Sequence, residues 1–151
     1  MCNQEDSLKD GAGVFGPHGI IGKINAVSGN FASGWSVLHT NLMISAMLKK
    51  SNTLCTVSWS GEEPSKLQLL YVPKYINLMI GDTVVTSGYN SSFVKNIDIG
   101  KIEEIVSEKD AAFQKAIIKP FTDFNSVGTA YIIVDTKQIE KDSLEQLHYE
   151  P

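Results

Sequence analysis

Apolar and polar residues alternate in short runs along most of the chain, and this period of two predicts β-strands. The clearest run is "LCTVSWSG", in which Cys55, Val57 and Trp59 alternate with threonine and serine. In "MISAMLKK", Ile44 and Leu48 fall on one predicted face. Glycine, asparagine, serine and proline separate the runs, which is typical of a β-sandwich or a β-barrel.

Further strands are expected in "IIGKINAV", "KLQLLYV", "DTVVTSG", "DIGKIEEIV", "FQKAIIKP" and "TAYIIVD". The segment between Gly13 and Asp135 contains no long amphipathic pattern with helix caps, so we predict an all-β fold. Residues 136–151 are highly charged and have few apolar anchors, and we expect a flexible or short helical tail there.

The charge composition argues against nucleic-acid binding. The net charge is −4, and all 13 basic residues are lysines, so the chain lacks the bidentate guanidinium forks that grip phosphates and guanine edges. The apolar runs are far shorter than the ~20 residues that span a bilayer, so no transmembrane segment is expected in this chain.

The cysteines and the glycine-rich segment give no cofactor or metal signature. Cys2 and Cys55 do not form a zinc or redox motif; a disulfide between them and their redox state stay open. "GAGVFG", from Gly11 to Gly16, matches G-x-G-x-x-G. A polar decapeptide precedes it and a strand pattern follows it, so we expect an entry loop and no dinucleotide site.

A serine hydrolase is the sharpest catalytic alternative, because β-barrels can carry Ser-His-Asp triads. Ser87 is the candidate nucleophile, although "VTSGY" lacks the glycine framing of such nucleophiles. The residues that could complete the triad are His18 or His39, and Asp82 or Asp98. All of them also suit turns, and we expect no catalysis.

Two acidic pairs and a sequon complete the candidates. Glu103 and Glu104 are expected to point to opposite faces of a strand, which excludes joint acid–base chemistry. Glu62 and Glu63 precede a proline in a turn and are expected to be solvated. Asn90–Ser92 matches the glycosylation sequon, a pattern with a high chance rate.

The segment "LLYVPKYINLMIGDTVVTSGYNSSF" followed by "IGKI" resembles the central signature of the extracytoplasmic β-domain of the rod shape-determining MreC family. "HGIIGKINAVSGNF" and "FTDFNSVGTAYIIV" resemble two further family segments in the same order, so the resemblance spans Gly13 to Val134. The family's prolines are missing from residues 93–100, which leaves the conformation of that loop open, though Asn96 can adopt a left-handed conformation.

The resemblance implies two small six-stranded-type β-barrels. The first would cover residues 13–60, with a terminal strand at 129–135 returning to it, and the second would cover residues 61–126. On this interpretation five residues are structural turn residues without a catalytic role: Gly81, Asp82, Ser87, Gly88 and Gly100.

The resemblance also implies a function: a non-enzymatic scaffold that links the MreB cytoskeleton to peptidoglycan synthesis and so maintains rod shape. The implied partners are MreB, MreD, RodZ, RodA and the elongation-specific penicillin-binding transpeptidase, with a homodimer in a membrane-anchored parent protein. This chain would be its periplasmic part, since the family's membrane helix and coiled coil have no counterpart here. A degenerate chymotrypsin-like or cell-wall hydrolase using Ser87 is the alternative. The surface that binds the transpeptidase stays open.

Self-association of the chain is expected to be weak. The lysines in "MLKK" and "FQKAIIKP" are the kind of charge that discourages pairing between exposed strand edges. We therefore expect a monomer or a weak dimer in dilute solution.

Overall fold

The computed structural model describes residues 11–89, 93–109, 111–125 and 131–132. These residues form strands and turns without a helix, which confirms the predicted all-β fold. The strands are β1 (Gly13–Phe15), β2 (Ile20–Ser28), β3 (Phe31–Ser36), β4 (Ile44–Leu48), β5 (Leu54–Ser58), β6 (Leu67–Pro73), β7 (Thr83–Thr86), β8 (Asp98–Val106), β9 (Phe113–Pro120) and β10 (Tyr131–Ile132).

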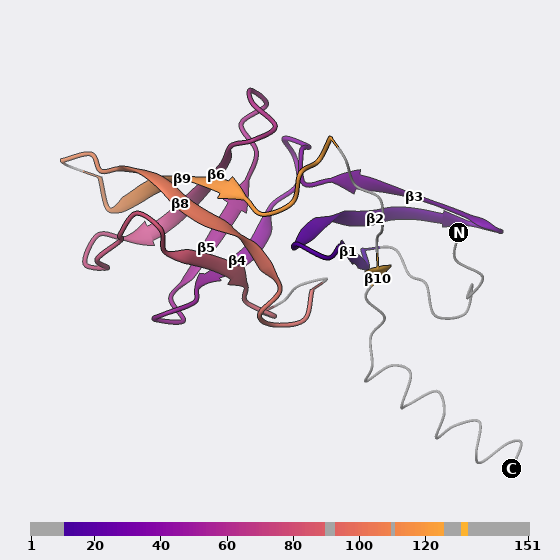
Figure 1. Ribbon diagram of the computed structural model, residues 1–151, viewed down its shortest axis with the longest axis horizontal. Coiled ribbons are helices and arrows are strands. Elements are labelled where there is room, and N and C mark those ends of the chain that lie inside the picture. Colours follow the sequence, from indigo (N-terminus) through magenta and orange to yellow (C-terminus); the bar gives the residue numbers. More distant parts are fainter. Residues whose placement is uncertain (1–10, 90–92, 110, 126–130, 133–151) are drawn as a thin grey trace, which may run out of the picture.

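Six strands close into a barrel in the order β4-β5-β6-β9-β8-β7 (Figure 1). All neighbouring strands are antiparallel, and β4 closes the ring by pairing with β7 through Ala46 and Thr86. Every strand in the ring has two hydrogen-bonded neighbours, so the barrel exposes no strand edge.

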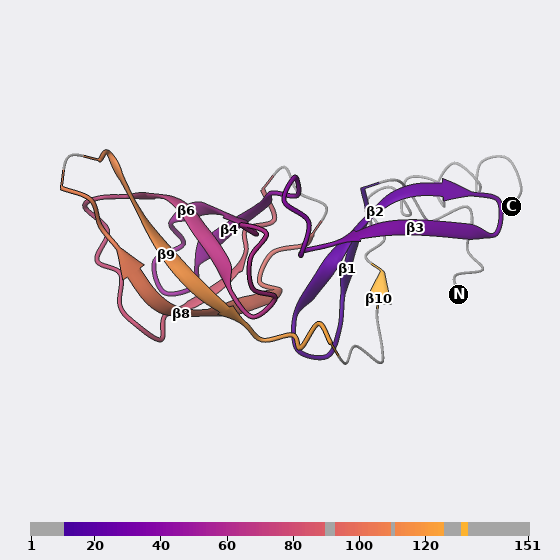
Figure 2. The same cartoon turned by 90° about the horizontal axis from the view of Figure 1, so that it is seen from above.

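The remaining four strands form a smaller sheet in the order β10-β1-β2-β3. Ile24 exchanges backbone hydrogen bonds with Gly11 and Ala12. Beyond Ile24, β3 is the described strand that pairs with β2, and the two strands continue as a ribbon away from the barrel (Figure 2). Of the two barrels expected, one is therefore a closed six-stranded ring, and the other is, among the described residues, a four-stranded sheet.

The inward-facing residues of the barrel fill its interior, as the alternating pattern predicts. Ile44, Ala46 and Leu48 are buried together, and so are Cys55 and Val57. The core cluster continues through the other barrel strands with these residues: Leu67, Leu69, Val72, Val84, Ile99, Ile102, Ala116 and Ile118.

The small sheet joins the barrel at the start of β2 and just after β3. Ile20 and Val37 are almost fully buried and belong to the same core cluster as the barrel residues. The Thr122 hydroxyl donates a hydrogen bond to the Ile20 carbonyl at 3.0 Å. Gly19 lies against the Asp98 backbone so closely that a Cβ atom there would be 2.4 Å from the Asp98 carbonyl oxygen.

The predicted boundary between the two units at residue 60 is wrong, because β4 and β5 pair inside the closed barrel. The hydrogen bonds from β4 to β7 and from β5 to β6 decide this assignment, and no local pattern in the sequence records them. β10, which pairs with β1, lies within the range 129–135 that was expected to return to the first unit. The expected tail at 136–151 lies outside the described residues, as do Cys2 and the sequon at 90–92.

The two lysine-bearing strands also have a different setting from the one expected. β4 and β9 each have a neighbour on both sides in the closed ring, so Lys49 and Lys50, in the turn after β4, and the lysines of β9 protect no free edge. Among the described strands, the two at the edges of the small sheet are β10 and β3, and the sequence of β3, "FASGWS", contains no charge. A search of the described residues for a helix long and apolar enough to cross a membrane finds none.

Candidate functional site

The signature segment of the sequence forms β7 and the two corners that flank it. Gly81 has φ 93° and Gly88 has φ 74°, both in the left-handed region that favours glycine. A Cβ atom at Gly81 would meet nothing within 4 Å, so only its backbone conformation requires glycine. At Gly88 a Cβ atom would also lie 3.0 Å from Lys95, so both conformation and space restrict that position.

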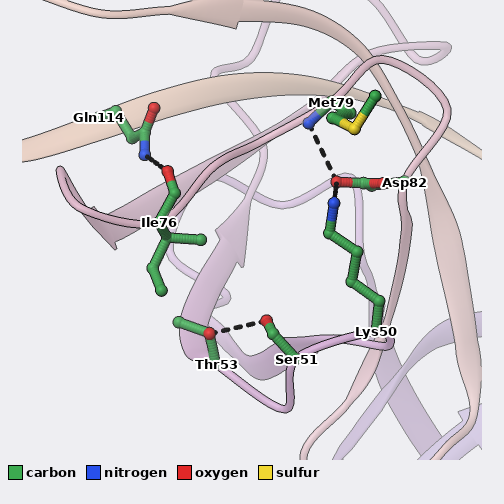
Figure 3. A network of polar contacts seen from close by, with 7 residues as sticks. All are labelled: Lys50, Ser51, Thr53, Ile76, Met79, Asp82 and Gln114. Atoms are coloured by element: carbon green, nitrogen blue, oxygen red, sulfur yellow. Dashed lines mark hydrogen bonds and ion pairs between the residues drawn. The ribbon is translucent and has the colours of Figure 1, made fainter.

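Asp82 organises the first corner. Its Oδ2 atom accepts the Met79 backbone N–H at 3.0 Å, while its own N–H donates to the Met79 carbonyl at 3.1 Å (Figure 3). The same oxygen lies 3.2 Å from the Lys50 ammonium, which extends from the turn between β4 and β5. Asp82 therefore closes its own turn and ties it to a neighbouring one.

Gln114 anchors the loop that leads into this corner. Its side-chain amide donates to the Pro73 carbonyl at 3.0 Å and to the Ile76 carbonyl at 2.6 Å (Figure 3). Gln114 is buried at the start of β9. One buried polar side chain thus binds the carbonyl at the end of β6 and a carbonyl of the loop that follows it.

The second corner is built around Thr86 and Ser87. The Thr86 hydroxyl donates to the Val94 carbonyl at 2.6 Å and accepts the Ile97 N–H at 2.9 Å. Asn96 has φ 72°, so it adopts the left-handed conformation expected for it. The loop that lacks the family's prolines is therefore held by the threonine and by a left-handed asparagine.

Ser87, the candidate nucleophile, takes part in this local network. Its Oγ atom lies 2.8 Å from the Ser45 Oγ atom and accepts the Tyr89 N–H at 3.0 Å. The side chain is almost fully buried. Among the described residues, its hydrogen-bond partners are thus a serine and a backbone amide, neither of which can act as a general base for it.

The histidines and Asp98 are placed in other settings. His18 lies exposed in the turn between β1 and β2, and the Asp98 side chain is exposed at the start of β8. The His39 ring stacks on Trp35 with centroids 4.3 Å apart, and its Nδ1 atom accepts the Asn41 N–H at 3.2 Å. The structure does not bring these groups into hydrogen bonds with Ser87.

The acidic pairs show one departure from expectation. Glu103 and Glu104 are both exposed, because a bulge between Ile102 and Glu104 breaks the alternation on which opposite faces were predicted. Glu62 and Glu63 are solvated, as expected.

The glycine-rich segment and Cys55 carry structural roles in the described residues. The entry loop expected at "GAGVFG" is in part wrong: Gly13–Phe15 form strand β1, which pairs with β2 on one side and β10 on the other. Burial raises the pKa of the Cys55 thiol from 9.0 to about 12. A thiol with so high a pKa is a poor nucleophile and a poor metal ligand at neutral pH.

Gly100 marks the closest approach of two barrel strands. A Cβ atom there would lie 2.4 Å from the Lys119 carbonyl oxygen on β9. Beside the end of β9 lies a hollow of about 320 Å³, lined by two prolines and two phenylalanines together with Ser65, Lys119, Thr122, Asp123 and Asn125. Among the described residues, no group of three or more histidines, cysteines and carboxylates could hold a metal ion.

Comparison with known proteins gives one family. A model of the family described as "Rod shape-determining protein MreC, barrel core" matches residues 3–134. The cell shape-determining protein MreC of Listeria monocytogenes is 29% identical over 131 residues, which cover 85% of this chain. The chain spans 44% of the length of that relative.

Solved structures agree with the described fold. An MreC structure from Listeria monocytogenes has a TM-score of 0.78 at 26% identity, with 85% of this chain and 63% of that chain covered. MreC from Pseudomonas aeruginosa has a TM-score of 0.77 at 19% identity, covering 86% and 83%. MreC in a complex with the penicillin-binding protein PBP2 from Helicobacter pylori has a TM-score of 0.69 at 18% identity, covering 83% and 79%. The last two show likeness of fold alone.

Proposed function

The chain belongs to the rod shape-determining MreC family, and from this premise we propose that it is the extracytoplasmic β-module of a non-enzymatic scaffold for cell elongation. The main support for this proposal is the family match, which covers both the small sheet and the closed barrel. In this role the module links the MreB cytoskeleton to peptidoglycan synthesis and so maintains rod shape.

The partner with the most support is the elongation-specific penicillin-binding transpeptidase. A fold relative from Helicobacter pylori was solved in complex with PBP2, and other fold relatives are described as a major periplasmic domain. MreB, MreD, RodZ and RodA are proposed as partners of the longer parent protein, in which the chain would be paired as a homodimer. For those partners the support is family membership alone.

A scaffold of this kind needs rigid surfaces more than reactive groups. The corner residues fit that need: Asp82 closes a turn, Ser87 joins two strands, and Gly81 and Gly88 supply the left-handed backbone. We propose the same structural role for Gly100. The hydrolase alternative finds no supporting contact around Ser87 among the described residues.

Two measurements test the proposal. Depletion of the protein in cells that encode it should lower the ratio of cell length to width and disperse newly made peptidoglycan, visualised with fluorescent D-amino acids. The purified chain should bind the transpeptidase of the same organism in calorimetry. Unchanged cell shape after depletion would contradict the scaffold, and labelling of Ser87 by a fluorophosphonate probe would favour the hydrolase.

A further inference from the structure

Three lysines form a row across neighbouring strands of the barrel. Lys119 of β9 is paired directly with Lys101 of β8. Lys66 immediately precedes β6, whose first residue pairs with Ile118. The register therefore places Lys66 beside Lys119, on the side away from Lys101. All three lysines are exposed, and β6, β9 and β8 lie side by side in the barrel (Figure 2), so the lysine row occupies one strip of its outer surface.

The positive charge of the lysine row is not neutralised by close carboxylates. Like charges that face each other directly weaken an antiparallel strand pair. Among the described residues, no carboxylate oxygen lies within 4.0 Å of the ammonium of Lys101 or Lys119, whereas the Lys66 ammonium lies 4.0 Å from Glu63. The side chains of Lys66 and Glu63 are both more than half exposed, and such a pair is weak in water. The row is thus a local concentration of positive charge on a chain whose net charge is −4.

Carboxylates further along β8 limit the width of the lysine row. Glu103 and Glu104 follow Lys101 on this strand, and both are exposed. A broad anionic surface, such as a membrane, would bring its charges against these carboxylates as well as against the lysines. An extended peptide is narrower: its side chains on one face lie about 6.8 Å apart, and neighbouring strands of the barrel lie about 4.8 Å apart. Two acidic side chains of one peptide therefore reach all three lysines.

The hollow beside the end of β9 adjoins the lysine row. Lys119 belongs to its lining, and so does Ser65, which directly precedes Lys66. The carboxylate in the lining, Asp123, accepts the Asn125 N–H at 3.0 Å within its own loop. At about 320 Å³ the hollow is small for a ligand pocket and suits one bulky side chain. Its apolar lining residues are Pro64, Pro120, Phe121 and Phe124.

We propose that the lysine row and the hollow together form a docking site for an acidic peptide segment of a partner protein, extended across β6, β9 and β8. Carboxylates of the peptide bind Lys66, Lys119 and Lys101, and one bulky apolar side chain enters the hollow. The site lies apart from the corners that flank β7, and it does not depend on the proposed scaffold function. Because the lysines are exposed, binding weakens as the salt concentration rises.

Binding of a model peptide tests the lysine row. The probe is a fluorescein-labelled peptide in which one phenylalanine has two glutamates on each side, and its affinity for the purified chain is measured by fluorescence anisotropy at about 0.1 M salt. Lys119→Glu should weaken binding roughly tenfold or more, because repulsion replaces attraction at the centre of the row. The matched control is Lys115→Glu, another exposed lysine of β9. It lies about 13 Å along the strand from Lys119, beyond the Debye length of about 10 Å, and should change the affinity less than about twofold.

Altered probes test the hollow and the class of ligand. A peptide with alanine in place of phenylalanine should bind roughly fivefold or more weakly, because it leaves the hollow unfilled. A peptide with glutamine in place of each glutamate should not bind detectably. Equal affinity for the phenylalanine and alanine peptides, or equal effects of Lys119→Glu and Lys115→Glu, would overturn the proposal. Binding of phosphatidylglycerol vesicles that depends on Lys119, without binding of the peptide, would assign the row to a lipid surface and would also overturn it.

NMR titration of the unsubstituted chain keeps the test valid if a lysine variant fails to fold. Addition of the phenylalanine peptide should shift the amide resonances of Ser65, Lys66, Lys119 and Asn125, which belong to the row and the hollow. The amide of Lys115 should not shift. Shifts that are confined to residues outside the row and the hollow would show that the peptide binds elsewhere, and the proposal would be wrong.

Discussion

The closed barrel and the small sheet use the same antiparallel ladder but satisfy it differently. In the barrel every strand has two neighbours, and buried side chains from all six strands form one core. In the small sheet β3 has one neighbour, and Ile20 and Val37 are the members of the core cluster that precede Leu42 in the chain. Closure therefore protects the backbone of the barrel without help from charges, whereas among the described strands the small sheet stays open, and its edge strand β3 carries no charge.

The largest expected difference between the two regions is in local stability. Amides of β6 and β9 should exchange only through global unfolding, whereas those of the ribbon from Asn25 to Gly34 should exchange through local opening. We expect protection factors roughly 1,000-fold higher in the barrel than in the ribbon. Native-state hydrogen exchange by NMR measures these protection factors. Equal protection in both regions would contradict the expected difference in local stability.

The second largest difference is expected in the stability lost when a side chain is truncated in the barrel or in the ribbon. Leu69 is fully buried in the barrel, so Leu69→Ala should lower the free energy of unfolding by about 2–5 kcal/mol. Val27→Ala, at a half-buried position on the ribbon, should cost less than about 1 kcal/mol. Urea denaturation measures both, and a cost for Val27→Ala as large as that for Leu69→Ala would show that the ribbon belongs to the cooperative core.

Substitution of the corner glycines of the barrel should give the next largest loss of stability. Gly88→Val should destabilise the fold by about 1–3 kcal/mol, because a β-branched residue is disfavoured at positive φ. Gly81→Val should cost less than Gly88→Val, since a Cβ atom at Gly81 would meet nothing within 4 Å. Gly81→Asn is the control, because asparagine tolerates this conformation. Thermal midpoints unchanged in both valine variants would refute the structural role of these corners.

Alkaline pH should weaken the barrel through Cys55. Its pKa is about 12 in the folded chain against 9.0 for the exposed thiol, so the protonated thiol is favoured by folding. This stabilisation is complete below pH 9 and is lost as pH rises from 9 toward 12. At pH 10 the free energy of unfolding should be lower by about 1.4 kcal/mol from this group alone.

Cys55→Ala serves as the control, because lysines and tyrosines also titrate in this range. Its free energy of unfolding should fall less steeply between pH 9 and 10 than that of the unsubstituted chain. Identical slopes for the two proteins would show that the thiol does not contribute.

The smallest expected effect belongs to the serine pair between β4 and the end of β7. Ser87→Ala removes the hydrogen bond to Ser45 and should cost about 0.5–1.5 kcal/mol. In a double-mutant cycle with Ser45→Ala, the second substitution should cost less than it does alone. Strict additivity would mean that the two hydroxyls act independently, and a structural role for Ser87 would lose its main support.

The sequence by itself determined the local features of the chain. Alternation predicted β4 and β5, because a strand buried on one face must repeat every two residues. Gly81 and Gly88 were expected at corners, and Asn96 was recognised as able to adopt a left-handed conformation, because these preferences depend on the residue itself. The ordered signature segments also sufficed to predict the family, which the match over residues 3–134 confirms.

Tertiary structure decided which strands pair and where an edge remains. β4 meets β7, and β6 meets β9, across long stretches of chain, and no local period records such contacts. Those pairings placed β4 and β5 in the barrel and left β3 at an edge of the small sheet among the described strands. The bulge between Ile102 and Glu104 likewise left both Glu103 and Glu104 exposed, and it depends on the register between β8 and β9. Local sequence thus set the conformation of each segment, while the hydrogen bonds between distant segments set its neighbours.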